Sequence, residues 1–215
     1  MSLHRLTGIV LKRRNIGSVD RLVTLFSAAG KQEFRARGTQ KLASKLAGSL
    51  EPLTLVELTV APSRRSVIIG SVVRESYRSI HENLAKIAAA GLLASAAETL
   101  VVGQLDDPVS YRRLREAMAL VSRSRTNREV FLGIAYGLWN LLAALGYAAL
   151  PTGATAAEGR LRLVLLRGQV NLVRRIRCAV ATARRSAEGA VAAAERAAER
   201  PVPAAPFFWT TLTRR

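Results

Sequence analysis

Five short segments near the start of the chain have the composition of β-strands, and they limit the fold more than any other feature. Each is rich in β-branched and large apolar residues, and turn-forming residues such as Gly, Asn, Pro and Ser separate the segments. The predicted strands cover residues 6–11, 21–26, 31–37, 53–60 and 67–73, with a bulge or bend expected at Gly70. This pattern predicts a small antiparallel barrel of the oligonucleotide/oligosaccharide-binding (OB) type.

A short apolar segment between the third and fourth predicted strands fits the same barrel. Leu42, Leu46 and Leu50 recur at helical spacing within residues 39–50. We therefore expect a short helix or loop here that plugs the barrel, with its lysines on the rim.

The charge of the chain is strongly positive and unevenly distributed. The net charge is +18 and the sequence pI is about 11.5, so the chain repels itself unless it has an anionic partner. Residues 1–79 contain 14 Lys or Arg and 5 Asp or Glu, residues 80–150 contain 7 and 6, and residues 151–215 contain 12 and 4. This division predicts a basic N-terminal domain (1–79), a nearly neutral domain (80–150) and a basic tail (151–215), with nucleic acid as the partner.

The basic side chains of the predicted barrel are the candidate nucleic-acid-binding residues. Lys31, Arg35 and Arg37 alternate along one predicted strand and therefore share a face, which Lys41 and Lys45 extend. The full candidate set is Lys12, Arg13, Arg14, Lys31, Arg35, Arg37, Lys41, Lys45 and the loop pair Arg64 and Arg65. Few aromatic residues are available for base stacking, so we expect binding to be mostly electrostatic and tolerant of sequence.

The N-terminal sequence resembles the N-terminal domain of the RecO family of bacterial DNA repair proteins. The matching positions are Gly8, Val10, Leu11, Gly17, Asp20, Leu22, Val23, Gly30, Lys31, Ala36, Gly38, Ser44, Leu46, Gly48, Leu50 and Pro52. Ser18 and Leu53 depart from the family pattern, which usually has Glu and often has Phe there. The resemblance continues through the stretches ESYRSIHENLAKI and LWNLLAALGY and so covers about residues 5–150.

The resemblance implies an OB-fold barrel followed by a helical domain, in a protein that binds DNA without catalysis. It implies binding to single- and double-stranded DNA, annealing of complementary strands and loading of RecA together with RecR and RecF. The acidic C-terminal tail of single-strand DNA-binding protein is a further implied partner. The implied location is the cytoplasm, at the nucleoid.

The middle of the chain has the pattern of helices. The first is predicted over residues 81–102, the second begins at Asp107-Pro108, and the third runs from Asn127 to a stop at Gly146. The last region includes 21 consecutive uncharged residues, long enough for a membrane span. A central core helix explains them equally well, and Asn140 together with the resemblance favours the core helix.

The region after residue 150 departs from the family. It contains 15 Ala and 12 Arg, no Lys and no Asp, and only Cys178 where the family often has two Cys pairs, so a thiolate zinc site is not expected. It is either a genuine basic tail, with an Ala-rich helix over residues 186–200, or a poorly ordered or frame-shifted segment.

Other function classes find little support in the sequence. His4 and His81 have no partner nucleophile at a recognisable spacing, and no phosphate-binding Gly-rich loop or HExxH motif is present. We expect no enzyme activity, no cofactor, no metal and no small-molecule substrate. The N-terminus has no apolar region typical of a secretory signal. An RNA- or ribosome-binding OB protein and a membrane-associated structural protein remain as alternatives.

The frame-shift hypothesis makes a prediction about the gene. GC-rich DNA read out of frame gives an Ala- and Arg-rich, lysine-free sequence. If the codons for residues 153–158 have T at two free wobble positions, another frame reads Cys-Asp-Arg-Cys-Gly or a close relative, which is the family's first zinc pair. The nucleotide sequence of the gene tests this, and other wobble bases would contradict it.

Overall fold

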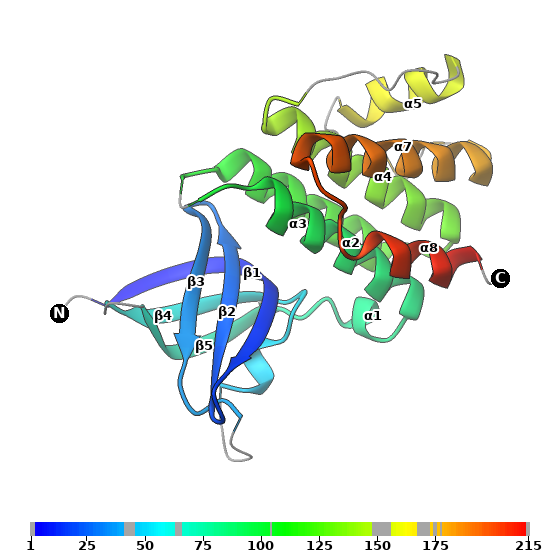
Figure 1. Cartoon of the computed structure of the whole chain (residues 1–215). Coiled ribbons are helices and arrows are strands. Elements are labelled where there is room, and N and C mark those ends of the chain that lie inside the picture. Colours follow the sequence, from blue (N-terminus) through cyan, green and yellow to red (C-terminus); the bar gives the residue numbers. More distant parts are fainter. Residues whose placement is uncertain are drawn as a thin grey trace. The chain divides into compact units, whose positions relative to one another are not determined.

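The computed structural model contains a closed β-barrel and a set of helices (Figure 1). It describes residues 3–40, 46–62, 66–103, 105–147, 156–166, 173, 176 and 178–213. The contacts divide the chain into two compact units. Residues 1–77 and 101–111 form the barrel unit, and residues 78–100 and 112–215 form the helical unit.

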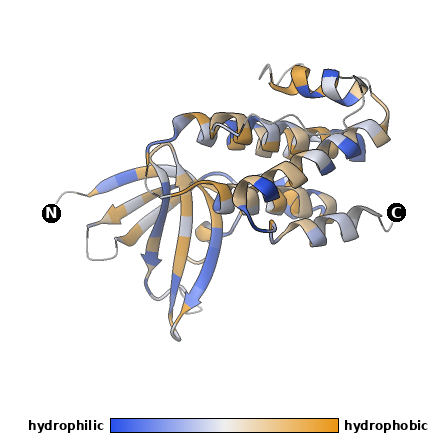
Figure 2. Cartoon of the chain, turned by 45° about the horizontal axis from the view of Figure 1, so that its top comes forward, coloured by the Kyte–Doolittle hydropathy of each residue, from blue (hydrophilic) through white to orange (hydrophobic). Residues whose placement is uncertain are grey.

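Five strands form the barrel, as the sequence predicts. They are β1 (His4–Ile16), β2 (Asp20–Ser27), β3 (Gly30–Ala36), β4 (Leu55–Ala61) and β5 (Val67–Glu75), in the order β1-β2-β3-β5-β4. All neighbours are antiparallel except β3 and β5, which are parallel through a short contact. Hydrophobic and hydrophilic positions alternate along the strands in Figure 2, as expected when one face of each strand lines the core.

Three register irregularities interrupt the pairing of the barrel strands. In β1 one extra residue, Leu11, lies between the pairs Val10–Leu25 and Lys12–Thr24. In β5 one extra residue is Ile69, next to the glycine at which the sequence predicts a bulge or bend, and another is Arg74, between the pairs Leu55–Glu75 and Val56–Val73. Such bulges increase local twist and change which side chains face outward.

Aliphatic side chains fill the barrel. Its core consists of Val10, Val23, Leu25, Phe34, Ala36, Leu50, Val56, Leu58, Val60 and Ile68, with Leu6 and Leu46 packed against it. The part of the predicted plug that the structure describes next to the fourth strand packs on this core through Leu46 and Leu50, and Leu50 belongs to a short 3-10 helix, η1 (Gly48–Leu50). Leu42 lies outside the described residues. The fourth strand begins at residue 55 rather than 53, because Leu53 has a left-handed φ of 64°.

Local capping signals fix the helix ends in the middle of the chain. The predicted helix over residues 81–102 is α2 (Leu84–Leu100), and a short helix, α1 (Arg78–His81), precedes it. Helix α3 (Pro108–Arg123) begins where predicted, and the Asp107 carboxylate accepts a hydrogen bond from the Ser110 N–H at 2.9 Å. Helix α4 (Asn127–Ala144) ends at Gly146, whose φ is 85°, and the Tyr147 N–H donates to the Leu142 carbonyl at 2.8 Å.

Helix α4 is the central helix of the helical unit. Its residues from Val130 to Leu142 are all buried. The Asn140 amide donates to the Tyr136 carbonyl and to the Leu165 carbonyl, so this polar group is satisfied within the unit. None of the described helices is both long enough and apolar enough for a membrane span.

Three described helices lie in the region after residue 150. They are α5 (Ala156–Leu166), α7 (Val180–Ala198) and α8 (Ala205–Thr213). Alanines form most of the buried face of α7, which packs against α4. The Arg162 guanidinium of α5 lies 4.1 Å from the Trp139 ring centroid, and Trp209 of α8 stacks on Phe131 at 6.3 Å. The reading frame of this region stays a prediction.

Gly137 lets helices α2 and α3 approach α4 closely, which generates a stability prediction. A Cβ at this position would lie 2.6 Å from Leu93 Cδ2 and 2.7 Å from Ala117 Cβ. At Gly91 of α2 a Cβ meets nothing within 4 Å, and this makes Gly91→Ala a matched control. Both substitutions gain helix propensity, so their difference isolates the overpacking.

We expect Gly137→Ala to be less stable than Gly91→Ala by about 1–3 kcal/mol in urea unfolding. Equal free energies of unfolding would contradict this close packing.

Candidate nucleic-acid interface

The outer face of strands β1, β2 and β3 carries the largest group of predicted DNA-binding residues that the structure describes. Figure 1 shows these three strands side by side in the barrel. Residues directly opposite each other in antiparallel strands point to the same side. One row across the face is Lys12, Thr24 and Glu33, and a second is Arg14, Leu22 and Arg35. Lys31, opposite Phe26, begins a third row.

The bulge at Leu11 places two of these basic residues on the outside. Before the bulge, Val10 points into the barrel core opposite Leu25. Because Leu11 is an extra residue, Lys12 pairs with Thr24 on the outer side. In a regular strand Lys12 would instead lie opposite Val23 and point into the core. The bulge therefore adds Lys12 and Arg14 to the face that already has Lys31 and Arg35.

Arg13 lies on the other side of β1. It is opposite the core residue Val23 and forms an ion pair with Glu51, which follows η1. The side chain of Arg13 is 29% exposed. The structure therefore separates Arg13 from Lys12 and Arg14, although the three are adjacent in the sequence.

The remaining predicted residues lie elsewhere. Arg37 is exposed and follows the end of β3. Lys41, Lys45, Arg64 and Arg65 lie outside the described residues.

A segment of the barrel unit covers one end of this face. The Phe26 and Tyr111 rings meet edge to face, with their centroids 5.9 Å apart. The Asp107 N–H donates to the Ala28 carbonyl at 2.8 Å, and the backbone of Gly30 lies against Leu105. Residues 101–111 thus pack at the β2–β3 turn, while Lys12, Arg14 and Arg35 lie toward the opposite end, where β1 turns into β2.

The sequence did not reveal that carboxylates accompany these basic residues. Arg14 Nη2 lies 3.8 Å from Glu33 Oε2, and both side chains are more than half exposed. Arg35 donates through Nε to Asp20 Oδ2 at 2.7 Å, and its Nη2 lies 2.5 Å from the same oxygen. Arg35 is 43% exposed, whereas the Asp20 side chain is only 8% exposed. The face is therefore positive, but it also contains a buried carboxylate, that of Asp20, which binds Arg35.

Asp20 also fixes the backbone after β3. Its Oδ1 accepts a hydrogen bond from the Gly38 N–H at 2.8 Å. This hydrogen bond and the Arg35 guanidinium, with a smaller contribution from the charge of Arg37, hold the pKa of Asp20 below its usual value. The resemblance to the RecO family includes Asp20, but its partner lies 15 residues away and no local pattern pairs the two.

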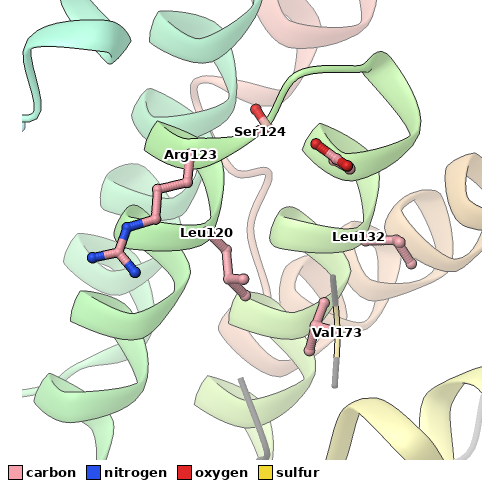
Figure 3. Close-up of a pocket in the computed structure, with 6 residues that line it drawn as sticks. Leu120, Arg123, Ser124, Leu132 and Val173 are labelled. Carbon is pink, nitrogen blue, oxygen red and sulfur yellow. The ribbon is translucent and has the colours of Figure 1, made fainter. Parts of the chain in front are cut away.

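A small pocket in the helical unit is a weaker candidate for a site. Figure 3 shows its lining of Leu120, Arg123, Ser124, Glu129, Leu132 and Val173. Two of its polar groups already act at helix ends, because Ser124 donates to the Val121 carbonyl and Glu129 accepts from the Arg125 N–H. Among the described residues, no group of three or more His, Cys, Asp or Glu side chains could hold a metal ion.

The lowered pKa of Asp20 predicts how stability depends on pH. A carboxylate whose pKa is lower in the folded state stabilises the fold above its unfolded pKa of about 3.9. That contribution is lost as the pH falls through the folded-state value. We expect the wild-type chain to lose stability below about pH 4, and Asp20→Asn to be less stable at neutral pH with a flatter acid profile.

Urea unfolding at several pH values measures this effect. Glu33→Gln is the control, because its carboxylate is exposed and its contact with Arg14 is loose. An acid profile of Asp20→Asn that matches the wild type would contradict the assigned role of Asp20.

Known proteins resemble the chain in the same region. Residues 1–73 match the family described as "Recombination protein O N terminal". "DNA repair protein RecO" of Synechococcus sp. (strain JA-2-3B'a(2-13)) is 28% identical over 156 residues, or 67% of this chain and 55% of the relative. The protein of the same name from Roseiflexus sp. (strain RS-1) is 31% identical over 150 residues, or 67% of this chain and 50% of the relative.

A third relative shows a higher identity over a shorter region. "DNA repair protein RecO" of Anaeromyxobacter dehalogenans (strain 2CP-1 / ATCC BAA-258) is 38% identical over 106 residues, or 47% of this chain and 41% of the relative. The chain spans about half the length of these curated relatives. The match to the family model, the barrel topology and these relatives agree, and the N-terminal OB-fold barrel of this chain belongs to the RecO family.

Proposed function

We propose that this chain is a DNA-binding recombination protein that acts in DNA repair by binding and annealing strands rather than by catalysis. The observation that carries the proposal is the positive outer face of β1–β2–β3 on a RecO-type barrel. In OB folds the face of strands 2 and 3, with the loops after strands 1 and 4, binds oligonucleotides. The relatives named DNA repair protein RecO support the assignment to repair.

The charges of this face suit a phosphate backbone. Lys12, Arg14, Lys31 and Arg35 lie along two strands that flank β2, and the β2 side chains between them are Leu22 and Thr24. Lys and Arg side chains in such a row can follow successive phosphates and release their counterions, which makes binding sensitive to salt. The net charge of +18 supports attraction of nucleic acid from a distance.

The finer steps of the proposal come from the resemblance to the RecO family. The chain would bind single- and double-stranded DNA and would anneal strands coated by single-strand DNA-binding protein, whose acidic C-terminal tail it would contact. With RecR and RecF it would help load RecA onto this DNA at the nucleoid. Annealing of coated complementary strands with and without RecR tests these steps.

A matched pair of variants tests the DNA-binding face. The double variant Lys12→Gln and Arg14→Gln removes two charges of β1 from the outer face of the barrel. Arg5→Gln with Arg74→Gln removes two charges from the β1–β4–β5 side of the barrel, where Arg5 lies opposite Thr59 and Arg74 pairs with Glu57. Arg14 and Arg74 each pair with a glutamate, so the two double variants are closely comparable.

We expect only the Lys12/Arg14 variant to weaken binding of a labelled single-stranded oligonucleotide. The negative slope of log K against log salt should become shallower by about 1.4, or about 0.7 for each lost phosphate contact. Fluorescence anisotropy at several salt concentrations measures this slope. Equal effects of the two variants would overturn the face assignment, and tighter binding of single-stranded RNA than of DNA would favour an RNA-binding function instead.

A further inference from the structure

Two loops at one end of the barrel are joined by Asp20 and Gln40. The Gln40 side-chain amide donates to the Asp20 carbonyl at 2.8 Å and to the Gly17 carbonyl at 3.3 Å. The Gln40 N–H donates to the Val19 carbonyl at 3.0 Å. The β1–β2 turn, residues 17–19, is therefore tied to the segment after β3, residues 37–40. We call these contacts, with those of the Asp20 carboxylate, the loop clamp.

The carboxylate of Asp20 is the centre of the loop clamp. One oxygen takes two contacts from the Arg35 guanidinium, and the other accepts the Gly38 N–H. Gly38 has a left-handed φ of 65°, which glycine adopts without strain and which forms part of this turn. A planar guanidinium held through Nε and Nη2 has little rotational freedom. Arg35 therefore lies in one orientation on the outer face while 43% of its side chain stays exposed.

A negative charge at this place needs an explanation. A carboxylate beside a surface that binds phosphates repels them, so on charge alone Asp20 would weaken binding. Its burial and its two directed contacts instead suit a role in holding other groups. Glu33, another acidic residue among the rows of this face, is exposed and lies 3.8 Å from Arg14 in a loose contact. The same face thus offers one buried, engaged carboxylate and one exposed carboxylate for comparison.

We propose that Asp20 is a positioning residue for single-stranded nucleic acid, which acts by fixing Arg35 and residues 37–40. The inference rests on the proposed function and deepens it, because it states that a buried anion, the Asp20 carboxylate, orients the cations that bind phosphates. Preorganised cations lose less conformational freedom on binding than free ones. Removing the anion should therefore weaken binding, although the face becomes more positive.

Two substitutions that replace a carboxylate by an amide of the same shape test the proposal, because they should not change the binding affinity in the same direction. Asp20→Asn and Glu33→Gln each remove one negative charge from the same face of the barrel. We expect Glu33→Gln to bind a single-stranded oligonucleotide as tightly as the wild type or more tightly. We expect Asp20→Asn to bind on the order of tenfold more weakly, equivalent to one charge-assisted hydrogen bond. The negative slope of log K against log salt for this variant should become shallower by about 0.7.

The salt slope separates positioning from a purely structural role. A loss of stability lowers the fraction of active protein, which a stoichiometric titration measures, but it does not change the salt slope of the folded molecules. The full chain should be assayed well below the thermal midpoint of each variant. The proposal would be overturned if Asp20→Asn binds as tightly as Glu33→Gln, or if it keeps the wild-type salt slope.

A second variant tests the loop part of the proposal if Asp20→Asn does not fold. Gln40→Ala removes the side-chain hydrogen bonds to the Gly17 and Asp20 carbonyls without changing any charge, and it leaves the contacts of the Asp20 carboxylate in place. Weaker binding with a shallower salt slope would support a role of the fixed loop, and wild-type binding would overturn that role. If the wild-type chain itself shows no salt-dependent binding, then the proposed function fails. If the wild-type chain shows salt-dependent binding and the Asp20 and Gln40 variants bind as tightly and with the same slope, the positioning role alone fails.

Discussion

The bulge at Leu11 is the constraint on which the candidate interface depends. Strand β1 pairs with β4 along its first half and with β2 along most of its length, and one extra residue lies where the strand bends. The bulge reverses the alternation of side chains, so that Val10 fills the core and Lys12 and Arg14 still face outward. Without it, Lys12 would lie opposite the core residue Val23 in place of Arg13, and neither Lys12 nor Arg14 would lie on the outer face.

The arrangement of the outer face follows from the pairing of β1, β2 and β3. Strand β2 lies between two strands with charged side chains, and its own outer residues Leu22 and Phe26 are buried. Residues 101–111 cover the Phe26 end through Tyr111 and Leu105. The other end keeps its charges exposed and is stiffened by the loop clamp. Along β2, packing and charge are thus separated: the end at Phe26 is covered, and the end next to Arg14 keeps its charges exposed.

The helical unit is built on a different principle. Helix α4 is buried on all sides, and small residues set the distance to its neighbours: Gly137 toward α2 and α3, and the alanines of α7 on its buried face. The buried amide of Asn140 is satisfied in this core, because it donates hydrogen bonds to the Tyr136 and Leu165 carbonyls. The long uncharged stretch of the sequence is therefore accounted for by burial within the unit.

The sequence alone determined the local features of this protein. Strand composition and turn residues predicted the five strands. The Asp107-Pro108 cap predicted the start of α3, the spacing of apolar residues predicted α4, and Gly146 predicted its stop, because these signals act over a few residues. Only the tertiary structure decided which basic residues share a face. The sequence analysis did not predict the bulge at Leu11, and the contact between Asp20 and Arg35 depends on the pairing of β2 with β3. Arg13 was therefore grouped with Lys12 and Arg14 in the sequence, whereas the folded barrel places it opposite the core residue Val23, paired with Glu51.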